Sequence, residues 1–465
     1  MAPRRFGTDG VRGVANADLT PELVIALGRA AARTLGTERF LVGRDTRVSG
    51  PMLAAALSAG LTAEGADVAD LGVLPTPGVA WLSSVEGYPA AMISASHNPF
   101  PDNGVKFFAS GGRKLSDDVE DHLEAELERL LDRASGPSGP LSGGHSGTAG
   151  PTGAALGRVQ PHDGRAGYTQ AVVDTLEGRR LDGLSVVVDC AHGAACTVGP
   201  DALAALGASV TVINACPDGT NINAGAGSNH PEGLAIEVVA QGADVGLGFD
   251  GDADRVVAVD HTGALVDGDQ LIALCAVDRQ SRRRLAGDTV VVTVMANLGF
   301  RRAMAERGIA VVETKVGDRY VLDALEQGGW SLGGEQSGHV IFRDLATTGD
   351  GILTGVQVLD VMARSGRALA ELASVMTRLP QVLRNVVVAD RHGLAAADIF
   401  WSDVEDVRRR LGGDGRVLVR PSGTEPVVRV MVEAVTLDAA EEACDELCAA
   451  LVRCLGAPAG ARVVP

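Results

Sequence analysis

The chain has 465 residues, of which 46% are hydrophobic, and a formal net charge of −18. This length exceeds what one hydrophobic core usually organises, so we expect three or four globular domains. The negative charge argues against nucleic acid or an anionic membrane as the main partner. The N-terminal MAPRRFGTDG has no apolar signal region, and no apolar run reaches the ~18 residues of a membrane span. We therefore expect a soluble, cytoplasmic protein.

Three segments of the chain repeat one plan of strand, polar turn, apolar helix and second strand. They cover residues 39–72, 184–215 and 288–317. Each continues through a further helix to a third strand that ends in an unusual loop, at residues 90–99, 243–254 and 330–339. Strands and helices that alternate in this way predict parallel α/β sheets, whose ligands bind at the carboxyl ends of the strands.

The segments around these repeats predict the domain boundaries. Residues 134–161 are rich in Gly, Ser and Pro, which is typical of a flexible connection. A last α+β segment begins near Gln381 and closes with a helix over residues 436–456. The expected fold is α/β, with three similar domains of mixed or parallel sheets and a C-terminal α+β domain around a central cleft. The expected domains are residues 1–155, 156–261, 262–378 and 379–465.

The stretch ISASHNPFPDNGVKFF, residues 93–108, places a polar pair, Ser96 and His97, at the end of an apolar strand. Loops just past strand ends are where α/β scaffolds hold reactive groups, so Ser96 is a candidate nucleophile. Ser, Asn and Pro are also ordinary turn residues, and from this stretch alone both interpretations stay open. Lys106, one of three lysines in the chain, is a candidate for a compact, titratable charge.

The stretch GFDGDADR carries Asp250, Asp252 and Asp254 at alternating positions. Three carboxylates this close repel one another unless a cation holds them, and oxygen ligands without His or Cys favour Mg²⁺. A solvated acidic turn is the weaker alternative, because the apolar run ADVGLGF leads the acids out of a buried strand. The same stretch contains a G-x-G-x-x-G pattern, but a strand, RVVAVD, is predicted next where a dinucleotide site needs a helix.

Two further loops carry groups that bind anions or polyols. RPSGTEP, residues 420–426, combines hydroxyls, a glycine and an arginine fork, and Arg429 offers a second fork. The alternative is a tight hairpin with a salt bridge. GGEQSGH, residues 333–339, carries Glu335, Ser337 and His339 in alternation, which suits hydrogen bonds to sugar hydroxyls. A glycine-bounded turn would look similar.

The chain contains no phosphate-binding G-x-x-x-x-G-K and no H-E-x-x-H. A candidate serine, a Mg²⁺ site, an anion nest and a polyol-binding loop together indicate phosphoryl chemistry on a sugar phosphate. Ser96 would carry the phosphoryl group next to the metal.

Nine motifs, in order along nearly the whole chain, resemble those of the α-D-phosphohexomutase superfamily. They are FGTDGVRG, GRDTRVSG, SASHNPFPDNGVKFF, PDGTNINAGAGSNHPE, GFDGDADR, TKVGDRYV, GGEQSGH, TTGDG and RPSGTEPVVRVMVEA. The resemblance implies four domains around a central cleft. One departure is Ala253, which stands where the metal loop of the family more usually has glycine, and AGAGSNHPE also differs from the commoner form. Neither removes a charged or nucleophilic group.

The resemblance also implies roles for individual residues. Ser96 would be a phosphoserine whose phosphate shares one Mg²⁺ per chain with Asp250, Asp252 and Asp254. The catalytic set around the transferring phosphoryl would be completed by Arg12, His97, Lys106 and Arg255. Sugar hydroxyls would be held by Glu335 and Ser337, with His339 in the same loop. The non-reacting phosphate would be bound by Arg420, Ser422, Gly423, Thr424 and Arg429.

The implied reaction interconverts glucosamine 6-phosphate and glucosamine 1-phosphate and feeds UDP-N-acetylglucosamine and peptidoglycan synthesis. Glucosamine 1,6-bisphosphate would be both intermediate and activator. A phosphomannomutase or phosphoglucomutase of the same superfamily stays an alternative, because no residue is seen to read the 2-amino group. A sugar phosphatase also stays open, whereas a non-catalytic phosphosugar sensor would not need Ser96. The expected partners are a small hexosamine phosphate and a second copy of the chain in a homodimer.

Overall fold

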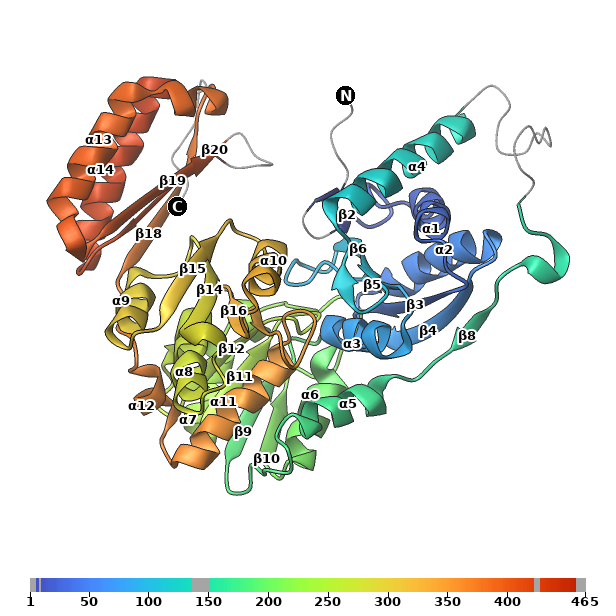
Figure 1. The fold of residues 1–465 in the computed structure, drawn as a ribbon, viewed down its shortest axis with the longest axis horizontal. Helices are drawn as coiled ribbons and strands as arrows, with labels where there is room; N and C mark the ends of the chain where they lie inside the picture. Colours follow the sequence, from blue (N-terminus) through green and yellow to red (C-terminus); the bar gives the residue numbers. More distant parts are fainter. Residues whose placement is uncertain (1–5, 8–9, 136–149, 422–426, 457–465) are drawn as a thin grey trace. The chain divides into compact units, whose positions relative to one another are not determined.

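The computed structural model describes residues 6–7, 10–135, 150–421 and 427–456 (Figure 1). The chain forms two compact units. The larger unit consists of residues 1–295 and 309–375, and the smaller unit consists of residues 296–308 and 376–465. Within the described residues, no helix combines the length and the hydropathy needed to cross a membrane.

The first sheet of the larger unit has the strand order β4-β3-β5-β6 at its centre. β4 and β5 run parallel to β3, whereas β6 runs antiparallel to β5. These strands are β3 (Arg39–Arg44), β4 (Asp67–Val73), β5 (Ala90–Ile93) and β6 (Asp102–Ala109). The sheet is extended by β1 (Phe6–Gly7), β2 (Gly10–Val14), β7 (Arg113–Lys114) and β8 (Val159–Pro161).

Two further sheets of this unit repeat the same central order, as β10-β9-β11-β12 and β15-β14-β16-β17. In each, the first three strands are parallel and the fourth is antiparallel to the third. The second sheet contains β9 (Ser185–Asp189), β10 (Ser209–Ile213), β11 (Val245–Phe249), β12 (Val256–Asp260) and β13 (Leu265–Val266). The third contains β14 (Thr289–Thr293), β15 (Ala310–Thr314), β16 (Leu332–Gly334) and β17 (Val340–Phe342). The predicted threefold repeat of α/β domains is confirmed.

The helices of the larger unit cover these sheets. In Figure 1, α1, α2 and α4 lie together on one side of the first sheet and α3 lies on the other. Alternation along β3 explains this, since Phe40 and Val42 join the core of α1, α2 and α4, whereas Gly43 faces Val79 of α3. The helices are α1 (Pro21–Leu35), α2 (Gly50–Ala63), α3 (Thr76–Glu86), α4 (Asp117–Ser135), α5 (Arg165–Asp174), α6 (Ala195–Ala205), α7 (Glu232–Gln241), α8 (Gly268–Ser281), α10 (Asp318–Gly328), α11 (Gly351–Ser365) and α12 (Leu369–Ala373).

The smaller unit is an antiparallel sheet packed against helices, as expected for the C-terminal α+β segment. Its strand order is β18-β20-β19, with bounds Gln381–Val387, Val427–Glu433 and Arg416–Pro421. Its helices are α13 (Asp398–Leu411), α14 (Leu437–Leu455) and α9 (Leu298–Glu306). The buried carboxylate of Glu433 accepts the N–H of Leu298 at 3.0 Å, which fixes the first turn of α9 against this sheet.

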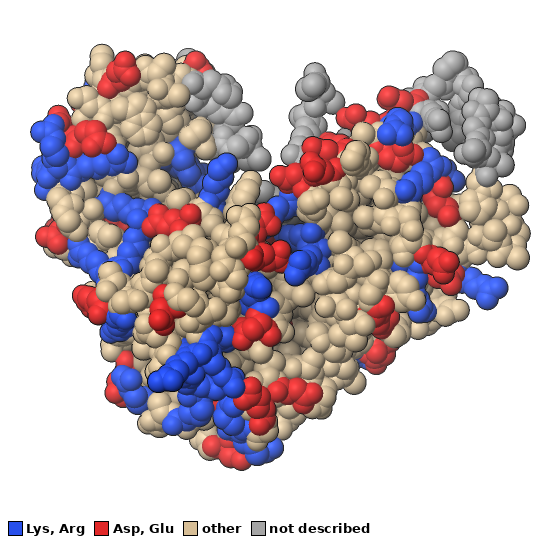
Figure 2. Space-filling model, viewed as in Figure 1, with Lys and Arg blue, Asp and Glu red and all other residues tan. Residues whose placement is uncertain are grey.

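The first sheet also includes a strand at the end of the Gly-, Ser- and Pro-rich segment. This strand, β8, pairs in parallel with β4. Figure 2 shows acidic and basic side chains close to one another over the visible face. Charge pairing also occurs below the surface, where Arg179 and Arg364 each make a 2.8 Å contact with the buried Asp360.

Candidate active site

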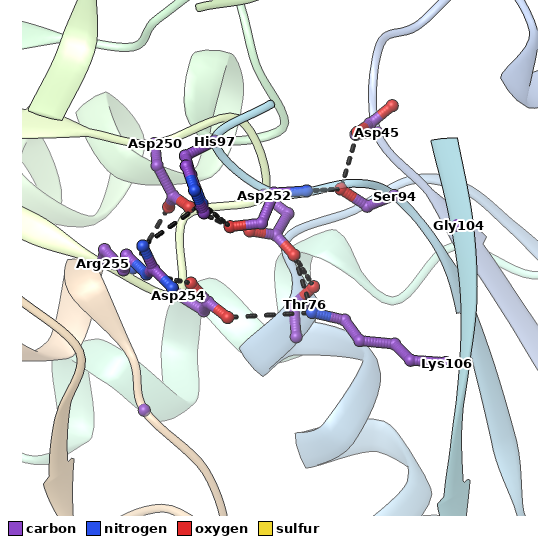
Figure 3. A network of polar contacts seen from close by, with 12 residues as sticks. Asp45, Thr76, Ser94, His97, Gly104, Lys106, Asp250, Asp252, Asp254 and Arg255 are labelled. Carbon is purple, nitrogen blue, oxygen red and sulfur yellow. Dashed lines mark hydrogen bonds and ion pairs between the residues drawn. The ribbon is translucent and has the colours of Figure 1, made fainter. Parts of the chain in front are cut away.

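Three loops of the larger unit supply the predicted site residues, and each joins the third strand of a sheet to the antiparallel fourth strand. They are the β5–β6, β11–β12 and β16–β17 loops, which carry Ser96, the three aspartates and Glu335 respectively. Because the three sheets share one strand order, these loops occupy equivalent positions at the carboxyl ends of parallel strands. Figure 3 shows side chains of the first two loops converging, together with groups from α3 and β6.

Ser96 lies in direct contact with the metal-loop carboxylates. Its hydroxyl donates to Asp250 Oδ2 at 2.6 Å, and the residue is 1% exposed. Its backbone adopts a φ of 50°, the left-handed conformation that is uncommon for a residue with a side chain. Local strain of this kind concentrates at functional sites.

Asp250, Asp252 and Asp254 form a compact buried group whose candidate ligand atoms lie within 4.8 Å of one another. Among the described residues, Asp252 Oδ1 and Asp254 Oδ1 find no hydrogen-bond donor. Buried carboxylate oxygens without donors require some other positive partner. Burial, followed by repulsion from Asp254 and Asp252, raises the pKa of Asp250 well above its ordinary value. The residues present therefore fit a hard divalent cation.

Two neighbouring groups hold the central aspartate. Lys106 Nζ lies 2.8 Å from Asp252 Oδ2 and 3.7 Å from Asp254 Oδ2, with the lysine 4% exposed. Thr76, the first residue of α3, donates its hydroxyl to Asp252 Oδ2 at 2.6 Å and its N–H to the Asp252 carbonyl at 2.9 Å. The first domain therefore contributes Ser96, Lys106 and Thr76 to a loop of the second domain.

A basic cluster lies beside the serine. Arg255 donates Nη1–H to His97 Nδ1 at 3.2 Å and its backbone N–H to Asp250 Oδ1 at 3.1 Å. Burial, then Arg255 and Arg12, lowers the pKa of His97 to about 4. His97 is therefore neutral near pH 7 and accepts from Arg255, while Arg12 and Arg255 supply positive charge next to Ser96.

The third loop packs on the metal loop through His339. His339 Nδ1 lies 3.6 Å from Asp254 Oδ2, and Nε2 lies 3.5 Å from Asp318 Oδ2. Burial by itself lowers the pKa of His339, but Asp254 and Asp318 outweigh it and raise the pKa to about 8. Burial likewise opposes the change at Asp254, where Lys106 and His339 hold the pKa well below its ordinary value. His339 thus contacts the metal loop in this structure.

Glu335 and Ser337 are the more accessible members of that loop. Glu335 Oε1 accepts the N–H of Gly317 at 3.0 Å, and Ser337 Oγ donates to Glu335 Oε2 at 3.4 Å. Ser337 is exposed and Glu335 is partly buried. Both side chains retain oxygens that can bind a polyol hydroxyl.

Arg420 and Arg429 belong to the smaller unit, where they are direct cross-strand partners on β19 and β20. Burial, then the charge of Arg429, lowers the pKa of Arg420. Like charges opposed across a strand pair destabilise a sheet, and an anion bound between them would relieve this repulsion. Ser422, Gly423 and Thr424 lie outside the described residues.

Thr76 was not assigned to the site from the sequence. The ion pair of Lys114 with Asp318, the carboxylate that contacts His339, was also not identified from it. Lys114 Nζ lies 2.5 Å from Asp318 Oδ2. Thr76 follows β4 in the stretch LPTPG, so its place at a strand end before a helix was a usable signal. Nothing in the local sequence indicates the contact with Asp252, because the two residues are 176 positions apart.

Comparison with known proteins extends these observations to almost the whole chain. Family models described as phosphoglucomutase/phosphomannomutase alpha/beta/alpha domains I, II and III match residues 3–133, 166–263 and 267–379. The model described as the C-terminal domain matches residues 383–450.

Individual relatives match over nearly their full length. The phosphoglucosamine mutase of Rhodococcus opacus (strain B4) is 52% identical over 452 residues, covering 96% of this chain and 98% of the relative. That of Symbiobacterium thermophilum is 53% identical over 440 residues, covering 93% and 95%. A solved phosphoglucomutase/phosphomannomutase family protein from Burkholderia thailandensis is 27% identical with a TM-score of 0.80, covering 99% of each chain. The chain belongs to the phosphoglucomutase/phosphomannomutase family.

Proposed function

We propose that this chain is a phosphoglucosamine mutase, an isomerase that interconverts glucosamine 6-phosphate and glucosamine 1-phosphate through phospho-Ser96. The observation that carries the proposal is the 2.6 Å hydrogen bond from Ser96 Oγ to a buried group of three aspartates. The substrate assignment draws on relatives at 52% and 53% identity that bear this name. The bound cation is proposed to be one Mg²⁺ per chain, held by Asp250, Asp252, Asp254 and a phosphate oxygen on Ser96.

The proposed reaction consists of two phosphoryl transfers. In the first, a sugar hydroxyl attacks the phosphorus of phospho-Ser96, the new P–O bond forms and the bond to Ser96 Oγ breaks. The hydroxyl loses its proton and the product is glucosamine 1,6-bisphosphate. In the second, Ser96 Oγ loses its proton and attacks the phosphorus of the other phosphate of the reoriented bisphosphate. The bond from that phosphorus to the sugar oxygen breaks, the sugar oxygen takes up a proton, and the isomeric monophosphate leaves the rephosphorylated enzyme. Positioning of the reactants and stabilisation of charge supply most of the acceleration in such transfers.

The side chains around Ser96 suit this charge stabilisation. A divalent cation bound at the aspartates would neutralise phosphoryl oxygens and orient them. Arg12 and Arg255 add positive charge beside His97. Lys106 is the candidate titratable charge of the sequence, and its ammonium contacts two carboxylates. We propose that Lys106 donates a proton or a hydrogen bond at the oxygen of the sugar.

Substrate binding is proposed to use the third loop and the smaller unit. Glu335 and Ser337 would bind sugar hydroxyls, with His339 holding the loop against Asp254. The non-reacting phosphate would be bound by Arg420, Ser422, Gly423, Thr424 and Arg429, since two arginines opposed on neighbouring strands favour an anion between them.

A phosphomannomutase or phosphoglucomutase activity is the second candidate, because the matching family models carry that description. The discriminating measurement is turnover of glucosamine, glucose and mannose phosphates, each with a trace of its bisphosphate and with Mg²⁺. We expect the highest kcat/KM with the glucosamine phosphates. A higher value with mannose or glucose phosphate would replace the assignment, and stoichiometric release of phosphate would indicate a phosphatase.

The role of Ser96 is tested by mass and by substitution. Intact-mass measurement is expected to show about 80 Da of phosphate on part of the purified chain, and Ser96→Ala is expected to remove both this adduct and nearly all mutase activity. Ser84→Ala, at an exposed serine of α3, is the control for the adduct. Full activity in Ser96→Ala would refute the mechanism. Calorimetric titration of the same variants with Mg²⁺ would test the cation separately.

The remaining expectations are also proposals. We propose a cytoplasmic enzyme of nucleotide-sugar synthesis, with the four domains bounded at residues 155, 261 and 378. A homodimer is a further expectation, and sedimentation analysis would test it.

A further inference from the structure

Two motifs of the sequence have no role in the mechanism described above, although both lie against the serine loop. They are GRDTRVSG, residues 43–50, which begins with the last two residues of β3, and PDGTNINAGAGSNHPE, residues 217–232, which follows β10. The motifs contact each other, since Val48 donates its N–H to the carbonyl of Gly219 at 2.8 Å. Their side chains reach the backbone on either side of Ser96.

The conformation of Ser96 needs such support. A left-handed backbone costs an L-amino acid about 1–2 kcal/mol, so the φ of 50° at Ser96 persists only if surrounding contacts impose it. Part of the restraint is local. Ser94 Oγ accepts the N–H of Ser96 at 2.9 Å and donates to Asp45 Oδ2 at 2.7 Å. Figure 3 shows Ser94 and Asp45 joined in this way.

Arg47 provides a second restraint. Its side chain is completely buried, and Nη2 donates to the carbonyls of Ser96 at 3.1 Å and Asn98 at 2.7 Å. Asp45 holds the arginine in place, because Oδ1 accepts the Arg47 N–H at 3.0 Å and Oδ2 lies 3.4 Å from Nη1. The carboxylate of Asp45 therefore orients both the serine loop and the Arg47 guanidinium that binds this loop.

Asn223, a residue of the second domain, binds the same two carbonyls of the serine loop. Its Nδ2 donates to the Ser96 carbonyl at 2.9 Å and to the Asn98 carbonyl at 3.0 Å. Asn229 Nδ2 donates to the intervening carbonyl, that of His97, at 3.2 Å. Asn223 is 8% exposed, and its own N–H is fixed by the Ala191 carbonyl at 2.9 Å. Three consecutive carbonyls of the serine loop are thus held by two side-chain amides of the second domain.

The metal loop approaches this junction closely. A Cβ on Gly251 would lie 2.6 Å from the Ser96 carbonyl oxygen and 2.9 Å from Asn223 Nδ2. The serine loop, Asn223 and the aspartate loop are therefore packed with no room for a side chain at residue 251. A movement of the Ser96 carbonyl would alter the 2.6 Å contact between Ser96 Oγ and Asp250.

We propose that Asn223 and Arg47 are positioning residues for phosphoryl transfer, which clamp the carbonyls of Ser96 and Asn98 and so fix Ser96 against the aspartate loop. This inference rests on the proposed function. Asn223 contributes the link between domains, and Arg47 the link within the first domain. The clamp keeps phospho-Ser96 aimed at the sugar hydroxyl, so transfer to sugar exceeds transfer to water.

The test uses the full chain with Asn223→Gly and Asn223→Asp. Glycine keeps the left-handed backbone of residue 223, which has a φ of 59°, while removing the amide. Aspartate keeps the shape but cannot donate a hydrogen bond. Asn221→Asp is the matched control, since the Asn221 amide contacts Cys216 and Asp218 in its own loop. The readouts are single-turnover transfer from labelled phospho-Ser96 to glucosamine 1-phosphate, loss of label to water, and hydrogen exchange of the segment 94–104.

We expect phosphoryl transfer to the sugar to fall about ten- to a hundredfold in both Asn223 variants, because small misplacements of a reacting group slow a reaction by this amount. Loss of the label to water should be unchanged or faster. The melting temperature should change little in Asn223→Gly. The segment 94–104 should exchange faster than in the wild type or in the control. Arg47→Lys, whose single ammonium cannot span both carbonyls, should give an intermediate loss.

Wild-type transfer, and an unchanged ratio of transfer to hydrolysis, in Asn223→Asp would overturn the inference. An equal loss of transfer and hydrolysis that tracks a lowered melting temperature would also overturn it, because that pattern describes a structural residue. If the wild type transfers no phosphoryl group to any hexose phosphate, the proposed function fails. The exchange measurement then still decides whether Asn223 holds the serine loop.

Discussion

At the scale of single residues, the site combines buried charge with backbone strain. Ser96 and Ala253 both adopt a positive φ, of 50° and 59°, in loops that carry the candidate nucleophile and the candidate cation ligands. The Ser96 conformation is imposed by hydrogen bonds to its carbonyl, whereas Ala253 lies between two aspartates and is completely buried. Ala253 therefore places a methyl group in a left-handed turn, at a position where the family more usually has glycine.

Ala253→Gly is expected to change the free energy of unfolding by less than about 1 kcal/mol. Relief of about 1–2 kcal/mol of backbone strain is offset by loss of a buried methyl group, about 0.8 kcal/mol, and by extra freedom of the unfolded chain, about 0.4–1 kcal/mol. The control is Ala202→Gly in α6, where no strain is relieved and about 2 kcal/mol should be lost. Urea unfolding measures both. Equal losses in the two variants would show that residue 253 stores no strain.

At the scale of elements, helix α11 is anchored by a buried acid. Asp350 caps the helix by accepting the Leu353 N–H at 2.9 Å, and it accepts the hydroxyl of the buried Tyr168 at 2.7 Å. Burial raises the pKa of Asp350 from 3.8 to about 6, although the hydrogen bonds from Leu353 and Tyr168 oppose this and Asp254 adds to it. The cap that starts α11 therefore carries a titrating charge in the core.

The stability of the larger unit is expected to depend on pH through Asp350. A raised pKa means that the folded chain binds the proton more tightly, so the contribution is complete below pH 3.8 and is lost as pH rises to about 6. The loss corresponds to about 3 kcal/mol. Asp350→Asn, which can still cap α11 and pair with Tyr168, should gain up to that amount relative to wild type between pH 4 and pH 7.

Urea unfolding of both proteins across this pH range measures the difference. Tyr168 and Asp254 are the titratable groups that act on Asp350. Asp350→Ala is the control that loses both hydrogen bonds and should be less stable at every pH. A constant difference between wild type and Asp350→Asn would mean that Asp350 does not titrate in this range.

At the scale of the whole molecule, the proposed chemistry is divided between two compact units. The larger unit holds the serine, the aspartates and the β16–β17 loop, and the smaller unit holds the two opposed arginines. Each unit has its own core and its own sheets. Under the proposed function, transfer of one phosphate would belong to the larger unit and retention of the other to the smaller unit.

Arg420→Ala tests this division. Loss of one charge-assisted partner should weaken binding of the non-reacting phosphate by about 1.5–3 kcal/mol, which appears as a higher KM. Free bisphosphate should also accumulate during turnover, because the intermediate is held less tightly. The level of phosphate on Ser96 should be unchanged. A lower rate with normal KM and no released bisphosphate would indicate that Arg420 is a structural residue of the β19–β20 pair.

The sequence by itself determined the features that depend on short spacing. The threefold repeat, the loops that follow each third strand and the repulsion within GFDGDADR are all properties of neighbouring residues, and the structure contains the repeat and the buried aspartate group as predicted. The G-x-G-x-x-G pattern could likewise be rejected as a dinucleotide site from neighbouring residues. The structure has strand β12 after the glycines, where such a site needs a helix. Hydrophobic periodicity carries this information because side chains along one element share a face.

Only the tertiary structure decided which distant groups meet. Thr76 and Asp252 are 176 positions apart, and Asn223 lies 127 positions from Ser96. The carboxylates that contact Lys106 also come from another domain. Such contacts follow from the packing of one domain against the next, and no period of 2 or 3.6 residues encodes them. Catalytic groups could therefore be named from their own loops, whereas the residues that hold them in place could not.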